Sequence, residues 1–96
     1  MSVYVDDMLR RAQVGRINSR WSHLFADSTE ELLAFGARLG MRPEWLQKPG
    51  TRREHFDLTE NKRAEALRLG AESITYPWGV AELFERRRAA ELGEQP

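Results

Sequence analysis

The segment over residues 55–70, in which a short strand passes directly into a helix, most restricts how this chain can fold. Residues 55–58 read as a strand, and the Thr59 hydroxyl that follows can accept a hydrogen bond from a backbone N–H of the first helical turn. Gly70 provides a left-handed stop. Lys62 and Arg63 occupy the first turn, where the helix dipole favours acidic residues. With the free amides they predict a site for an anion such as phosphate, unless both side chains point into solvent.

The size and composition of the chain limit the classes of protein that it fits. Its 96 residues suit one α/β domain over residues 1–93, with a frayed C-terminal tail at residues 94–96. The 15 basic and 15 acidic residues balance, so any preference for anions has to be local. The lack of cysteine excludes disulfides, thiolate catalysis and cysteine zinc sites. No apolar run is long enough for a membrane span or a signal peptide, so we expect a cytoplasmic protein without a membrane partner.

Strand-like and helix-like segments alternate along the chain. Strands are predicted at residues 2–5, 21–26, 55–58 and 71–76, and a helix follows each of the last three. Ser28 and Glu31 form a capping box before the first helix. This order predicts an α/β fold with a small, mostly parallel sheet of about four strands and helices packed on its faces. In the last helix we expect three arginines to be solvated: Arg86, Arg87 and Arg88.

The segment over residues 8–26 is basic, with no acidic residue and with four arginines: Arg10, Arg11, Arg16 and Arg20. Its part before Trp21 is predicted to be a long connection with a tight turn at Gly15. A connection of this length is often a functional lid or binding loop. Its arginines either line an anion site or pair with acids elsewhere, such as Glu30 or Glu31.

Polar residues occur at the predicted ends of the strands. In a parallel sheet these ends share one edge, where ligands bind. His55 and Asp57 point to the same face of their strand, because side chains alternate with a period of two. His23, in mid-strand, is either a core imidazole bonded to a carbonyl or a further ligand. The residues expected along the shared edge are Asp6 or Asp7, Asp27 with Ser28, and Asp57 with Thr59.

Three functions fit these patterns, and binding of a nucleotide or another phosphorylated small molecule ranks first. Cations and helix amides would hold the anion, and a tryptophan would stack on the base. Trp45 is otherwise a plug over the end of the core. A nucleic acid is a possible partner, but the balanced charge does not favour it. The ligand-binding residues of this hypothesis are Arg16, Trp21, Trp45, Thr59, Lys62 and Arg63.

The second function is a metal-dependent phosphoesterase or nuclease, in which carboxylates and imidazoles hold Mg²⁺ or Mn²⁺. Its metal ligands are Asp6, His23, His55 and Asp57, of which Asp6, His55 and Asp57 would be catalytic. The third function is a non-catalytic protein-interaction module. We also expect a homodimer, because a second copy can cover the exposed edges of a small sheet.

Several motifs are distinctive in combination: Tyr4-Val5-Asp6-Asp7-Met8, Gly15-Arg16, Trp21-Ser22-His23-Leu24, His55-Phe56-Asp57-Leu58-Thr59, Lys62-Arg63 and Leu69-Gly70-Ala71. Over residues 2–76 they resemble a family of short bacterial and phage proteins known only as a domain of unknown function. This resemblance implies one small domain and no particular activity. The first strand, Val3-Tyr4-Val5-Asp6, is also similar to that of PIN-type nucleases, which implies that Asp6 helps to hold a divalent metal.

Overall fold

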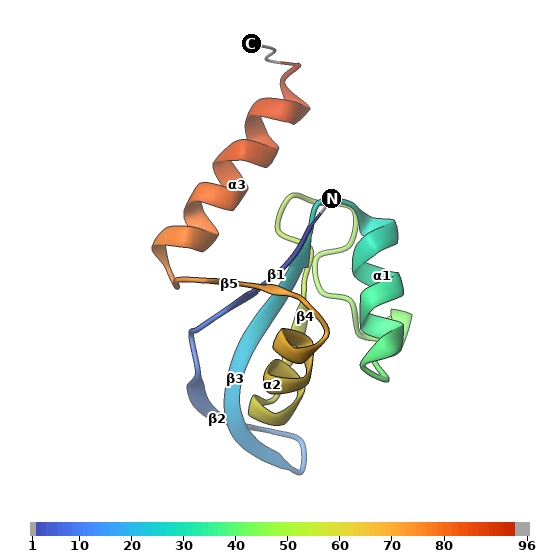
Figure 1. The fold of residues 1–96 in the computed structure, drawn as a ribbon, viewed down its shortest axis with the longest axis vertical. Coiled ribbons are helices and arrows are strands. Elements are labelled where there is room, and N and C mark those ends of the chain that lie inside the picture. Colours follow the sequence, from blue (N-terminus) through green and yellow to red (C-terminus); the bar gives the residue numbers. More distant parts are fainter. Residues whose placement is uncertain (1, 94–96) are drawn as a thin grey trace.

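The computed structural model describes residues 2–93 of the chain (Figure 1). The predicted frayed tail at residues 94–96 lies outside this part. None of the helices within it is long and apolar enough to cross a membrane. The elements follow in the order β1 (Val3–Asp6), β2 (Arg10–Val14), β3 (Ile17–Ala26), α1 (Thr29–Arg38), the short 3-10 helix η1 (Pro43–Trp45), β4 (Phe56–Leu58), α2 (Glu60–Arg68), β5 (Glu72–Ile74) and α3 (Trp78–Glu91).

The strands of residues 2–93 form one mixed sheet of five strands, in the order β2-β3-β1-β5, with β4 also paired to β3. β1, β2 and β4 run antiparallel to β3, whereas β1 and β5 are parallel to each other. The prediction of an α/β fold is confirmed, but that of a mostly parallel sheet of about four strands is wrong. The physical reason is the hairpin between β2 and β3, which reverses the chain without a crossover helix.

Residues 8–20, predicted to be a long connection, contain β2 and the first part of β3. The two strands pair from Arg10 opposite Trp21 to Val14 opposite Ile17. Gly15 makes the predicted tight turn with a φ of +59°, a conformation that glycine adopts without strain. All residues of β2 are exposed, so the hairpin lacks the apolar alternation that reveals a strand in a sequence. Figure 1 shows this hairpin at the lower end of the molecule.

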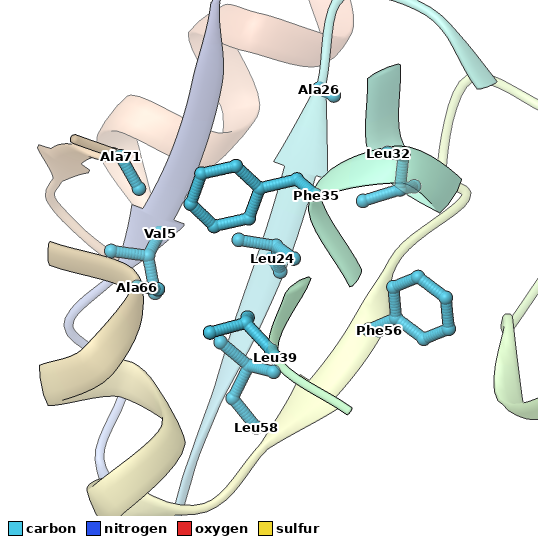
Figure 2. Packing of buried hydrophobic residues seen from close by; sticks show 10 residues of the cluster. All are labelled: Val5, Leu24, Ala26, Leu32, Phe35, Leu39, Phe56, Leu58, Ala66 and Ala71. Atoms are coloured by element: carbon cyan, nitrogen blue, oxygen red, sulfur yellow. The ribbon is translucent and has the colours of Figure 1, made fainter. Parts of the chain in front are cut away.

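Helices α1 and α2 cover one face of the sheet (Figure 1). Ser28 caps α1, since its hydroxyl accepts a hydrogen bond from the Glu31 N–H at 3.1 Å, as the predicted capping box requires. Alternate strand residues point to this face and form its core (Figure 2). These are Val5, Leu24, Phe56 and Leu58 from the strands, packed with Leu32, Phe35 and Leu39 near α1 and with Ala66 of α2.

Helix α3 covers part of the opposite face, where Tyr4 and Phe25 pack against Val80 and Leu83. Arg87, predicted to be solvated, is partly buried instead. Its guanidinium donates hydrogen bonds to the backbone carbonyl of Ala26 and, at 2.7 Å, to that of Arg52. Burial lowers the pKa of Arg87. The helix is therefore fixed to the end of β3.

The strand directions decide which predicted residues share an edge. β1 and β4 both run antiparallel to β3, so Asp6 and Asp57 lie near the same edge of the sheet. β3 ends at the opposite edge, where Asp27 and Ser28 follow it. The prediction that Asp27 and Ser28 join Asp6 at one edge is therefore wrong, because it required β3 to be parallel to β1.

Candidate metal centre

Both histidines of the chain lie on the face of the sheet that α1 and α2 leave open. His23 of β3 pairs directly with Asp57 of β4 across the two strands. His55 lies just before β4 and forms a β-bridge with Gln47. Because side chains alternate along a strand, His55 and Asp57 point away from the buried Phe56. The sheet therefore places both imidazoles beside one carboxylate.

Asp6, at the end of β1, is fully buried beside His23. Its Oδ2 lies 2.6 Å from His23 Nδ1, and its Oδ1 accepts the backbone N–H groups of His23 at 2.9 Å and Met8 at 3.3 Å. An ionised carboxylate only accepts, so His23 carries a proton on Nδ1 and, when neutral, a lone pair on Nε2. Asp6 therefore fixes the orientation of the His23 ring through Nδ1 and leaves the lone pair on Nε2 available.

A bulge between β1 and β2 places Asp6 in this position. The pairings of β1 and of β2 with β3 are out of step by two residues, so residues 6–9 face only residues 22–23. The Asp6 carboxylate and the Ser22 hydroxyl accept backbone N–H groups there, in place of the missing ladder partners. Bulges beside functional sites commonly re-aim a side chain, and this one turns Asp6 toward its neighbour on β3.

His55 is oriented in the same way by a backbone group. Its Nδ1 lies 2.7 Å from the carbonyl oxygen of Arg53. A carbonyl only accepts, so Nδ1 donates, and neutral His55 has its lone pair on Nε2. In each histidine, Nδ1 donates a hydrogen bond to an acceptor of the protein, and Nε2 is left to bind a metal. Metal-ligating histidines commonly show this arrangement.

The two Nε2 atoms converge on the Asp57 carboxylate. Asp57 Oδ1 lies 3.3 Å from His55 Nε2 and 4.0 Å from His23 Nε2. One ligand atom from each of the three residues lies within 4.8 Å of the others. Tetrahedral zinc holds ligand atoms about 3.4 Å apart, because its bonds to nitrogen and oxygen are about 2.1 Å long. The set fits a metal ion after a small closing movement of His23.

The same geometry shifts the pKa values of His55 and Asp57. Burial opposes the protonation of His55, but the Asp57 carboxylate and the Arg53 carbonyl outweigh it and raise the pKa of His55. The hydrogen bond from His55 lowers the pKa of Asp57, against the effect of its partial burial. The free site thus favours a positive charge between His55 and Asp57, where a metal ion would replace the proton.

Three further side chains border the cluster. Arg63 of α2 donates from Nε to the backbone carbonyl of Asp6 at 2.8 Å. Phe25 lies beside both imidazoles, with its ring centroid 5.9 Å from each. Tyr76, which is 46% exposed, has its ring centroid 6.0 Å from that of His23. Sequence reasoning does not single out Tyr76; its signal there is its position after the last strand, which ends at the same edge as β1.

The first turn of α2 contains the residues of the predicted anion site. Thr59 caps the helix as predicted and accepts the Lys62 N–H at 3.3 Å. The Lys62 ammonium lies 3.5 Å from the Glu65 carboxylate, and Arg63 is held by Asp6. Both cations are therefore engaged by other groups of the protein.

The other residues of the nucleotide-binding hypothesis lie on separate elements. Arg16 lies in the hairpin turn, and Trp21 donates from its indole N–H to the carbonyl of Ala12 at 2.8 Å. Trp45 belongs to η1 and is 48% exposed. The structure gathers the histidines and aspartates but distributes the predicted nucleotide-binding residues over the hairpin, η1 and α2.

The fold and the site together define a small α/β domain with a mixed sheet and a cluster of two histidines and a carboxylate on its open face. The chain belongs to the family described as "Protein of unknown function (DUF4031)", whose model matches residues 3–90. The expected membership of an uncharacterised family is thereby confirmed. No curated protein and no solved structure matches the chain. The function has to be inferred from the site.

Proposed function

We propose that this protein binds a divalent transition-metal ion through His23, His55 and Asp57 and uses it to hydrolyse phosphate esters. The convergence of both Nε2 atoms on Asp57 Oδ1 carries this proposal. The Nδ1 atoms of both rings are already engaged by acceptors. Without a proton or a metal ion between them, three acceptor atoms would face one another without a donor, which is unfavourable.

The donor set favours zinc or iron over the ions expected from the sequence. Imidazole nitrogen suits Zn²⁺ and Fe²⁺, whereas Mg²⁺ and Mn²⁺ prefer carboxylate and water oxygens. Three protein ligands leave a position for water or substrate, as in catalytic zinc sites. Solvent reaches all three side chains, whose exposed fractions are 20% for His23, 17% for His55 and 46% for Asp57. A bound ion would polarise a phosphoryl oxygen and activate water.

Arginines near the cluster favour a phosphorylated substrate. Arg10 pairs with Trp21 across the hairpin, and Trp21 lies two residues before His23 on β3. Paired and alternate residues share a face of a sheet, so Arg10 is on the face of the cluster. Guanidinium groups bind phosphate oxygens and stabilise negative charge that develops on them. Binding of a nucleotide or another phosphorylated small molecule without turnover is the alternative proposal, and a non-catalytic interaction module is a third.

Calorimetric titration of metal-free protein with Zn²⁺ tests the metal centre. We expect one ion per chain, and an affinity at least about tenfold weaker for His55→Ala and for Asp57→Asn. Glu44→Gln is the matched control, because Glu44 is an exposed carboxylate paired with Arg42 on η1. Equal zinc affinity in all four proteins would refute the metal centre.

Hydrolysis of a chromogenic phosphodiester by the zinc-loaded protein tests the reaction. We expect turnover that requires the metal and that Asp57→Asn abolishes, because that substitution removes a ligand. Zinc binding without turnover would contradict the hydrolase and favour the binding proposal.

A further inference from the structure

The β2–β3 hairpin carries positive charge that the fold does not use. Arg10, Arg11 and Arg16 are exposed, and in the described part of the chain their side chains make no hydrogen bond or ion pair. Arg20 is paired with Glu60. Arg11 lies directly opposite Arg20 in the ladder. Like charges directly opposite each other destabilise a strand pair, and the Glu60 carboxylate, whose pKa both arginines lower, offsets part of this repulsion.

The hairpin leads directly to the metal centre. β3 runs without interruption from Ile17 to Ala26, so one strand contains both half of the hairpin and His23. Trp21 lies two residues, or about 7 Å, from His23 along this strand. The Tyr76 ring borders His23 as well, at 6.0 Å between centroids. Tyr76 therefore lies beside a metal ligand, and Trp21 and Arg10 lie on the same face of the sheet.

The metal ligands line neither of two cavities among residues 2–93. A cavity of about 260 Å³ lies between Ser28, Glu54 and Arg87, and another of about 400 Å³ lies near Lys48 and Arg53. Neither is lined by a residue of the cluster. Small molecules usually bind in concave pockets that bury most of their surface. An accessible cluster on a sheet face, at the base of a basic hairpin, suits an extended polymer better.

We infer that the substrate of the proposed metal centre is single-stranded nucleic acid. This inference rests on the proposed metal-dependent hydrolysis. Arg10, on the face of the cluster, and Arg16, in the hairpin turn, bind phosphates, and Trp21 and Tyr76 offer faces on which unpaired bases stack. The neutral net charge does not oppose this, because the charge that matters is concentrated on the hairpin. Cleavage adds one water across a P–O bond and leaves a terminal phosphate monoester and a terminal hydroxyl.

Binding is measured first, by fluorescence anisotropy with a labelled single-stranded oligonucleotide of about 20 nucleotides, in chelator so that no cleavage occurs. We expect the double variant Arg10→Ala and Arg16→Ala to bind at least about tenfold more weakly than the wild type. The dependence of log affinity on log salt concentration should become shallower by about 1.4, since each lost phosphate contact contributes about 0.7. Zinc affinity should not change.

The matched control removes two exposed arginines outside the hairpin: Arg42→Ala and Arg68→Ala. This variant has the same net charge as the first and should bind the oligonucleotide like the wild type. Equal weakening in both variants would mean that net charge alone attracts the strand, and would overturn the inference.

Cleavage separates the inference from the function on which it rests. We expect the zinc-loaded wild type to cleave the oligonucleotide. If it hydrolyses the chromogenic phosphodiester but neither binds nor cleaves the oligonucleotide, the inference fails and the proposed function stands. If zinc does not bind, the proposed function fails. Binding of a duplex more than about tenfold tighter than the single strand would also overturn the inference.

Discussion

The protons on the two histidines decide what can bind beside Asp57. Asp6 and the Arg53 carbonyl each hold a proton on Nδ1, so both lone pairs of the neutral rings point to the same carboxylate. A residue that touches no metal thus determines whether a histidine can be a ligand. The buried Asp6 is the clearest case, because its carboxylate also accepts the backbone N–H of the residue that it orients.

We expect Asp6→Asn to move the proton of His23 from Nδ1 to Nε2. The new amide oxygen can keep the backbone N–H groups, so its NH₂ group faces Nδ1, which then has to accept. A protonated Nε2 cannot bind a metal, and zinc affinity should fall by about 10- to 100-fold. Heteronuclear NMR of the imidazole rings reports the tautomer, and calorimetry reports the affinity.

Asp7→Asn is the control for this substitution. Asp7 is the exposed neighbour of Asp6, and its carboxylate accepts the Tyr76 N–H at 2.7 Å, which an amide oxygen can also do. Zinc affinity should stay at the wild-type value in this variant. A folded Asp6→Asn protein with wild-type zinc affinity would contradict the role given to Asp6.

The His55–Asp57 contact makes stability depend on pH in the metal-free protein. The contribution of Asp57 is present above its ordinary pKa of 3.8 and is lost as the pH falls through its lowered pKa. The contribution of His55 is present below its ordinary pKa of 6.5 and is lost as the pH rises through its raised pKa. Asp57→Asn should therefore destabilise the protein more at mildly acidic than at alkaline pH. Urea unfolding in chelator measures this difference, and an equal loss at both pH values would argue against an ionic contact.

At the scale of elements, a sequence reveals the helices and strands that have one buried face. α1 and α2 are predicted with their caps, because Ser28 and Thr59 precede helical patterns that end at glycine. β2 is missed, because none of its residues is buried and no apolar alternation marks it. Without β2 there is no hairpin, and β3 is then predicted to run parallel to β1. One exposed strand thus accounts for the wrong direction of the sheet.

The site is predictable to the extent that it is local in sequence. His55 and Asp57 share a face by alternation alone, and His23 is the other histidine of the chain. The role of Asp6 depends on the bulge between β1 and β2, and therefore on a strand register that the sequence does not state. The place of Tyr76 depends on the parallel pairing of β5 with β1, which joins distant parts of the chain.

The attachment of α3 to the sheet depends on Arg87 as well as on Val80 and Leu83. Arg87→Ala should lower the free energy of unfolding by about 1–3 kcal/mol, because two backbone carbonyls lose their charged donor. Hydrogen exchange should rise in the second half of α3, while zinc affinity stays unchanged because no ligand lies on this helix. Arg88→Ala is the control, since Arg88 is exposed and 3.9 Å from Glu85. Unchanged exchange in Arg87→Ala would contradict this role.

At the scale of the whole molecule, charge and free edges are the features that bear on partners. The chain is neutral, yet the hairpin is basic, and β2, β4 and β5 each pair with one strand only. Pairing of such an edge with a second copy would cover its free N–H and C=O groups. The homodimer stays a prediction, and light scattering at working concentration tests it.

Metal binding should raise the thermal stability of the whole domain. An ion at about 100 times its dissociation constant adds about 2.7 kcal/mol, which corresponds to roughly 10–20 °C in a domain of this size. We expect this rise with Zn²⁺ in a calorimetric scan, its reversal by chelator and a clearly smaller rise in Asp57→Asn. A rise of the same size in Asp57→Asn would mean that the ion binds elsewhere.

The continuity of β3 also fixes a length. His23 lies six positions after Ile17, which is beside the hairpin turn, and an extended strand covers about 20 Å over that interval. The distance between a polymer's binding point near the turn and the metal ion would be constant. The protein would therefore cut the polymer at a fixed distance from that point, as a molecular ruler does. Lengthening the hairpin by two residues on each strand would preserve the side-chain alternation and move the polymer's binding point by about 7 Å. The position of the cut could thus change in fixed steps while the metal ligands stayed where they are.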